Sequence, residues 1–280
     1  MPFKIGWVST GRGQGSMNLL NAMVKAIKEG EVNGELSFVM CSREQGEAEG
    51  SDQYIKQVQD YGIPLVSISS KKFMPDLRRE GKANPEAMRK WRIAYDREIM
   101  KCLESEGLKA DIMVLAGYML IVGEEICEKY DMINLHPAAP GGPAGTWQEV
   151  IWLLIHKRAQ ESGNMMHLVT KELDKGPPIS YCTFPIRGSE FDPLWAEMEK
   201  KLRAKMLAEI VKKEGEQNAL FAKIRQEGAK REIPLVVQTV KAFAEGRIRL
   251  ENKKIIAEGK VLDKPFCLNK EIEGAISSKC

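Results

Sequence analysis

Four side chains that can carry out acid–base or oxyanion chemistry fall at or near the ends of predicted strands: Asn134, His136, His167 and Asp174. Open α/β sheets bind ligands at the carboxyl ends of their strands. An asparagine amide can donate to a developing oxyanion, and a histidine can donate or move a proton near neutral pH. An aspartate can orient a neighbouring group or accept a proton. The set fits oxyanion stabilisation and proton transfer without a metal.

The same spacing also fits purely structural interpretations. The segment "NLHP" (134–137) can be a turn that ends a strand with a capping histidine, and "LDKGPP" (173–178) can be a hairpin turn. Two histidines and an aspartate could in principle bind a metal. They share no predicted helix, however, and no H-E-x-x-H occurs, so we expect no metal site. Spacing alone does not decide between chemistry and a turn.

A glycine-rich turn, "STGRGQGSMN", follows the first predicted strand. Glycines let backbone amides approach a ligand, and a helix N-terminus adds free N–H groups and partial positive charge. The G-x-G-x-G spacing differs from the dinucleotide fingerprint, and no acidic residue ends the second strand. The turn is therefore either a site for an anion such as phosphate or a tight turn without a ligand. Its candidate residues are Gly11, Gly13, Gly15, Ser16 and Asn18.

The order of predicted elements indicates a single α/β domain of parallel βαβ units. Apolar runs predict strands at 3–11, 34–42, 62–69, 110–120 and 130–136, and two more around a turn within 164–186. Helical patterns occupy 86–107, 147–160, the highly charged 189–228 and the amphipathic 233–248. We assign residues 1–250 to this domain, with a helical insertion near 205–231, and residues 251–280 to a C-terminal extension.

Composition narrows the class of protein. The 280 residues are 43% hydrophobic and 29% charged, and the net charge of +3 gives no argument for nucleic acid. No apolar run reaches the ~18 residues that span a bilayer, and the N-terminus carries no signal pattern. The six cysteines form no C-x-x-C pair and are expected to be reduced and mostly buried. We expect a cytoplasmic protein that acts on small molecules, not on nucleic acid or membranes.

The order of the motifs resembles the folate-dependent formyltransferase family. The motifs are "STGRGQGSMN", "AYDREI", "DIMVLAGYMLIV", "INLHP", "HLVTKELDKGPPI" and "IPLVVQTVKAFAEGRI", and the resemblance covers roughly 4–186 and 232–250. It implies a three-layer, Rossmann-like formyltransferase fold with a mostly parallel central sheet. It also implies an enzyme, monomer or homodimer, that uses 10-formyltetrahydrofolate as co-substrate. The implied acceptor is the amine of glycinamide ribonucleotide in de novo purine biosynthesis.

The resemblance also implies a role for individual residues. Asn134 and protonated His136 would hold the tetrahedral oxyanion, Asp174 would orient His136 and relay the amine proton through water, and His167 would support them from a second layer. The glycine turn would bind the ribonucleotide phosphate, and Arg92 would reach the same substrate. The folate pocket would be lined by Met119, Leu120, Ile121 and Val122.

Three departures from the family pattern leave the acceptor open. The phosphate turn is longer than usual, the loop "AAPGGPAGTWQEV" replaces the usual residues after "NLHP", and Leu120 stands where the family has an arginine. Other readings are formyl transfer to a different amine, hydrolysis of formyltetrahydrofolate, or non-catalytic binding of a nucleotide or folate.

Overall fold

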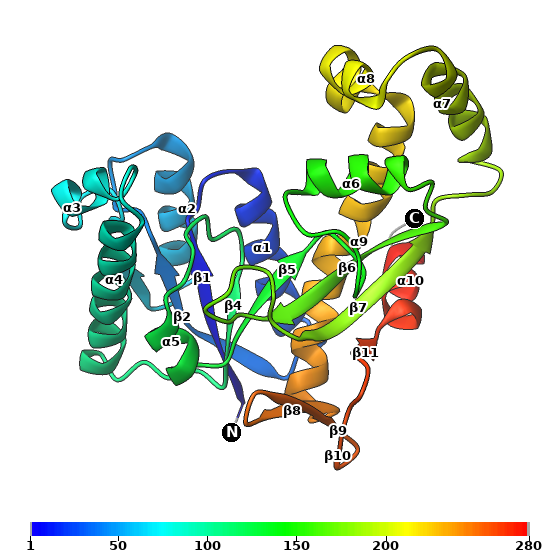
Figure 1. Cartoon of the computed structure of the whole chain (residues 1–280). Coiled ribbons are helices and arrows are strands. Elements are labelled where there is room, and N and C mark those ends of the chain that lie inside the picture. The colour runs from blue at the N-terminus through cyan, green and yellow to red at the C-terminus, as the bar shows by residue number, and fades with distance from the viewer. Residues whose placement is uncertain (1, 279–280) are drawn as a thin grey trace. The chain divides into compact units, whose positions relative to one another are not determined.

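The computed structural model describes residues 2–278 (Figure 1) and divides into two compact units. The first contains the residues up to Asn134, His167–Pro177 and Val240–Val261. The second contains Leu135–Met166, Pro178–Thr239 and the residues from Leu262 onward. The chain crosses between units within β5, β6 and α9, whose bounds are given below.

The first unit alternates strands and helices along the chain. Its elements are β1 (Phe3–Ser9), α1 (Gln14–Lys28), β2 (Gly34–Cys41), α2 (Glu49–Asp60), β3 (Leu65–Ser67), α3 (Pro75–Glu80), α4 (Pro85–Ser105), β4 (Ile112–Leu115), α5 (Glu124–Lys129) and β5 (Met132–His136), followed much later by β8 (Ile248–Glu251), β9 (Lys254–Ala257) and β10 (Lys260–Val261). The strands β5-β4-β1-β2-β3 are neighbours in that order, and every adjacent pair is parallel. The connections run in opposite directions from β1 and β4, so the two strands flank a topological switch point.

Helices cover both faces of this sheet. Trp91, Tyr95 and Ile99 of α4 pack in one core cluster with Val8 of β1 and Met40 of β2. Neighbouring strand residues point to the opposite face, and α1 contacts β2 and α2 contacts β3. Figure 1 shows α4 and α1 on opposite sides of β1. The expected three-layer α/β fold with a mostly parallel sheet is confirmed.

The predicted strands are confirmed with narrower bounds, and the apolar run at 110–120 is shortened most. Only Ile112–Leu115 form a strand there, and all four residues are buried. Gly117 has φ +71, a left-handed conformation that ends the extended backbone. Residues 116–123 are therefore a loop at the carboxyl end of β4, although their apolar character predicted a longer strand.

The second unit is mainly helical. Its elements are α6 (Trp147–His156), β6 (Glu161–Leu168), β7 (Pro178–Pro185), α7 (Asp192–Ala204), α8 (Leu207–Glu214), the 3-10 turn η1 (Gly215–Gln217), α9 (Ala219–Ala244), β11 (Phe266–Cys267) and α10 (Asn269–Ser277). The strands β11-β7-β6 are neighbours. A capping box between Thr146 and Glu149 begins α6. Val150, Ile151 and Leu154 of that helix are buried in one cluster with residues of α7, α8 and α9.

The sequence predicted a charged helical segment at 189–228 and a separate amphipathic helix at 233–248. The structure divides the first segment into α7, α8, η1 and the start of α9, and α9 runs unbroken past Pro234. Proline lacks an N–H and disfavours a helix interior. Buried residues follow Pro234 at helical spacing, among them Leu235, Val236 and Val240. Burial of this apolar stripe offsets the lost hydrogen bond. Gly246, at φ +69, follows the end of the helix as the sequence predicted.

The remaining features are the state of the cysteines and the length and polarity of the helices. Cys41, Cys127 and Cys182 are free and buried, Cys102 is half-buried and Cys267 is exposed, while Cys280 lies outside the described residues. Among residues 2–278, no helix is both long and apolar enough to cross a membrane.

Candidate active site

Asn134, His167 and Asp174 lie together in the first unit. The Nδ1 atom of His167 is 3.1 Å from the Leu168 carbonyl, which can only accept, so Nδ1 carries a proton. In the neutral imidazole the opposite nitrogen, Nε2, is then an acceptor, and it lies 3.4 Å from Nδ2 of Asn134. The same Nε2 is 3.7 Å from a carboxylate oxygen of Asp174. His167 thus uses one N–H of the Asn134 amide and leaves the second for another acceptor.

A tight turn between β6 and β7 orients the side chain of Asp174. Its own φ is +55, a left-handed conformation that aspartate and asparagine tolerate better than most residues. Two residues on, a Cβ on Gly176 would lie 1.6 Å from the Leu168 carbonyl oxygen, so only glycine fits there. The N–H of Leu168 donates to the carbonyl of Pro177, 3.0 Å away, and closes the turn. The "LDKGPP" segment is therefore the predicted turn and also presents a carboxylate.

His136 ends β5, two residues after Asn134, and belongs to the second unit. Its side chain is buried, and Nε2 lies 3.2 Å from the carbonyl oxygen of Pro143. Because a carbonyl only accepts, Nε2 carries the proton of this hydrogen bond. The Pro/Gly loop after β5 therefore holds the imidazole as a donor. Residues 134 and 136 share one side of their strand because side chains alternate along it.

The glycine-rich turn leads from β1 into α1. The N–H groups of Ser16 and Met17 both donate to the Gly13 carbonyl, and no side chain caps the first turn. The space where side chains would stand on Gly13 and Gly15 is empty within 4 Å. The open space beside Gly13 and Gly15 leaves room for an anion at the start of α1, where a phosphate site stays a prediction.

The other predicted residues of this turn play less direct parts. Gly11 has φ +60, and a Cβ there would meet the Tyr54 ring at 2.9 Å, so it shapes the turn. The hydroxyl of Ser16 is buried, 2.2 Å from where a Cβ on Gly117 would stand. The amide of Asn18 accepts a 2.7 Å hydrogen bond from the exposed Gln14.

Thr10 joins three loops at the switch point, a role that the sequence analysis missed. Its N–H donates to the Gly117 carbonyl at 3.1 Å. Its hydroxyl oxygen accepts from the N–H of Met119 at 2.9 Å and from the hydroxyl of Ser42 at 3.0 Å. The ends of β1, β2 and β4 are therefore tied through one buried side chain. A threonine after a strand and before glycine gave no signal of this, since its partners lie 32 and 109 residues away.

We expect Thr10→Val to loosen the loop after β4. Valine keeps the shape but cannot accept the two hydrogen bonds, which should lower the free energy of unfolding by about 1–2 kcal/mol. If residues 119–122 line a folate pocket, the KM for the folate co-substrate should rise more than kcat falls. Urea unfolding and steady-state kinetics measure the two effects. Thr10→Ser, which keeps the hydroxyl, should behave like the wild type, and equal losses in both variants would contradict this role.

The predicted folate-lining segment divides into exposed and buried residues. Met119 and Ile121 are 61% and 36% exposed, unusual for large apolar side chains. Val122 is buried and Leu120 packs against the same core cluster. Only Met119 and Ile121 therefore offer apolar side chains to a ligand, while Leu120 and Val122 can present backbone groups. Such exposed apolar groups suit the face of a planar ring.

Arg92 and Asp96 lie one turn apart on α4. Arg92 is half-buried, and no described residue forms an ion pair with its side chain, so its charge is available to an anionic substrate. Asp96 is buried and accepts a hydrogen bond from the N–H of Gly123 at 2.5 Å. Burial raises the pKa of Asp96 to about 7, against the opposing effects of this hydrogen bond and of Arg92. Asp96 thereby anchors the end of the 116–123 loop.

Side chains that can bind metals are dispersed in the part of the chain that the structure describes. Among residues 2–278, no three His, Cys, Asp or Glu side chains are grouped closely enough to hold an ion. The groups described above are hydrogen-bond donors, one carboxylate and a glycine-rich turn at the start of a helix. Such a constellation suits acyl-type transfer through a tetrahedral oxyanion.

Comparisons with known proteins agree with this class of fold and site. A family model described as "Formyl transferase" matches residues 12–211. Phosphoribosylglycinamide formyltransferase of Saccharomyces cerevisiae is 28% identical over 172 residues, which cover 59% of this chain and 76% of that protein. The enzyme of the same name from Dictyostelium discoideum is 27% identical over 224 residues, 76% of this chain and 98% of the relative.

One solved structure shares the fold over nearly the whole chain. Phosphoribosylglycinamide formyltransferase from Coxiella burnetii has a TM-score of 0.65 at 21% sequence identity, and the match covers 95% of this chain and 99% of that one. The architecture and the order of elements thus define an α/β enzyme of the formyl-transferring class. The chain belongs to the formyl transferase family.

Proposed function

We propose that this protein transfers the formyl group of 10-formyltetrahydrofolate to the amine of phosphoribosylglycinamide, the glycinamide ribonucleotide of purine biosynthesis. The observation that carries the proposal is the cluster of Asn134, His167 and Asp174, which leaves one amide N–H of Asn134 available beside a carboxylate. Membership of the formyl transferase family and the names of the relatives support the same reaction.

The chemistry begins with attack of the substrate amine on the formyl carbon. A carbon–nitrogen bond forms and the carbonyl electron pair moves to oxygen, where Asn134 and His136 would donate hydrogen bonds to the oxyanion. Asp174 would accept the proton released by the amine, through water. When the carbonyl forms again, the bond to N10 of the folate breaks and N10 takes up a proton. The products are the formylated amine and tetrahydrofolate.

Both proposed oxyanion donors, Asn134 and His136, already form hydrogen bonds in the structure without substrate. His167 fixes the Asn134 amide, so its free N–H is oriented before substrate arrives. The Nε2–H of His136 donates to Pro143 in the structure. The oxyanion would take the place of the Pro143 carbonyl as acceptor, which requires the loop after β5 to release the imidazole. A Pro/Gly loop with Gly141 at φ +76 and Gly145 at φ +119 is suited to that change.

The ribonucleotide would bind to polar groups, and the folate would bind to apolar side chains. The start of α1 at Gly13 and Gly15 would hold the phosphate of the ribonucleotide, and Arg92 would reach the same substrate. The exposed side chains of Met119 and Ile121 would cover the ring system of the folate. Free, buried thiols favour a reducing compartment, and we place the protein in the cytoplasm for this reason.

The test is a spectroscopic assay of folate release from a 10-formylfolate co-substrate, run with and without phosphoribosylglycinamide. We expect release that requires the ribonucleotide and a product that carries the formyl group by mass spectrometry. Release without any acceptor, with formate as product, would mean hydrolysis. The loop at 138–149 departs from the family pattern and would affect the choice of acceptor, so a panel of other primary amines is the necessary comparison. Binding of the folate with no turnover on any amine would refute the proposal.

A further inference from the structure

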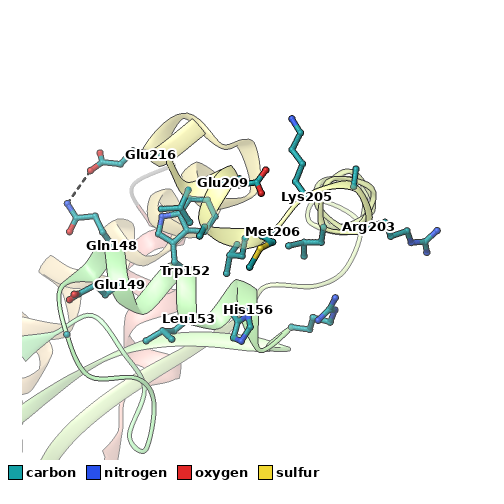
Figure 2. A pocket seen from close by; sticks show the side chains of 18 of the residues that line it. Gln148, Glu149, Trp152, Leu153, His156, Arg203, Lys205, Met206, Glu209 and Glu216 are labelled. Atoms are coloured by element: carbon teal, nitrogen blue, oxygen red, sulfur yellow. Dashed lines mark hydrogen bonds between the residues drawn. The ribbon is translucent and has the colours of Figure 1, made fainter. Parts of the chain in front are cut away.

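An open groove of about 1550 Å³ lies inside the second unit (Figure 2). Helix α6 forms one side, and the segment from the end of α7 through α8 to η1 forms the other. Its apolar side chains are Trp152, Leu153, Leu202, Met206, Leu207 and Val211. None of Asn134, His136, His167 and Asp174 lines it.

The groove exposes apolar groups that a protein usually covers. Met206 is 71% exposed and points into the groove towards α6, where Leu153 is 39% exposed (Figure 2). Exposed apolar patches rimmed by polar residues mark interaction surfaces. The volume exceeds the roughly 300–1,000 Å³ of small-molecule pockets. A segment of protein fits this surface better than a metabolite does.

The charges at the rim are separated by sign. Glu149 and Glu216 lie at one end, and Arg203 and Lys205 lie at the other (Figure 2). Gln148 donates a 3.1 Å hydrogen bond to Glu216, which leaves its negative charge in place. No described residue forms an ion pair with the side chain of Arg203 or Lys205. The groove therefore has an acidic end and a basic end, with the apolar side chains and Glu209 between them (Figure 2).

We propose that a second copy of this chain occupies the groove and forms a two-fold symmetric dimer. In such an interface the same patch faces itself, so groups near the axis meet their equivalents and the two ends exchange places. Met206, in the middle of the groove, would lie near the axis and pack against Met206 of the second copy. The basic end of each copy would face the acidic end of the other. A groove of a single charge sign would repel its own copy, whereas this one is self-complementary.

A charge-exchange experiment tests the arrangement at the full length of the chain. Arg203→Glu and Glu216→Lys are purified separately and mixed, and mass is measured by light scattering and sedimentation over a range of concentrations. The wild type should be a dimer. In a dimer of either variant alone, residues 203 and 216 of opposite copies carry the same charge at both ends of the interface. The dissociation constant of that dimer should therefore rise about tenfold or more. The equimolar mixture pairs opposite charges at both ends and should recover the dimer.

A second variant tests the middle of the groove. Met206→Asp should abolish the dimer because two carboxylates would meet near the axis. Met74→Asp, which alters an apolar side chain that is 47% exposed elsewhere, should leave the dimer intact. Circular dichroism melting confirms that all variants are folded, since none of these side chains is buried. A monomeric wild type, a dimer that survives Met206→Asp, or a mixture that stays monomeric would overturn the proposal.

Discussion

Asp174→Asn is expected to lower kcat by about 10²–10⁴-fold while the protein remains folded, the range typical of a group that transfers a proton in the transition state. The reason is chemical, because an amide cannot accept the proton that the attacking amine must lose. KM for either substrate should change far less than kcat, since the loss concerns the transition state.

Asparagine is the substitution that isolates the charge. Residue 174 has φ +55, and asparagine adopts the left-handed conformation as readily as aspartate, whereas alanine would add backbone strain. The side chain is 24% exposed and lies 3.7 Å from His167, so little packing changes. Single-turnover and steady-state assays measure the effect, with Asp76→Asn on the exposed helix α3 as matched control. A kcat within a few fold of wild type would exclude Asp174 as the proton acceptor.

The second large effect is expected from Asp96 and depends on pH. In the folded protein burial raises the pKa of this carboxyl to about 7, from 3.8 in an exposed chain. Between these two values the folded state binds more protons than the unfolded state, so the free energy of unfolding falls as pH rises. A difference of about three pKa units corresponds to on the order of 4 kcal/mol in the free energy of unfolding. This contribution is present at low pH and is lost once the pH rises above about 7.

Asp96→Asn should remove this dependence. The amide oxygen can still accept from the N–H of Gly123, but no charge has to be buried. Relative to wild type, the variant should become steadily more stable between pH 4.5 and pH 7, within the window that the two pKa values set, and the difference should level off above it. Urea unfolding at several pH values, again beside Asp76→Asn, measures the difference. Parallel stability curves for wild type and Asp96→Asn would show that the carboxyl titrates normally.

The position of the candidate catalytic groups at strand ends was predictable because the patterns that place them there are local, although spacing alone did not assign them a chemical role. Asn134 and His136 stand two residues apart at the end of an apolar run, so strand alternation alone places them on one side. The glycine turn is likewise a short-range pattern, a strand followed by glycines and a helix. Gly176 follows from the tight turn that the "DKGPP" sequence demands.

The continuity of α9 and the end of β4 could not be predicted, because both depend on contacts between residues that are far apart in the sequence. Pro234 reads as a helix break, yet burial of the residues after it keeps α9 continuous. The apolar run at 110–120 reads as one strand, but half of it is a loop held by Thr10 and by Asp96. These anchors lie far away in the chain, and aspartate in a charged helix is ordinarily exposed.

The sequence by itself therefore determined the α/β class, the order of strands and helices, and the residue types that can stabilise an oxyanion. Period-two and period-3.6 patterns and turn chemistry are properties of neighbouring residues. Only the tertiary structure decided that His167 fixes the amide of Asn134, that Asp96 is buried and that α6 and α8 enclose an apolar groove. Hydrogen bonding, burial and pKa depend on which distant segments pack together, and packing is a property of the whole fold.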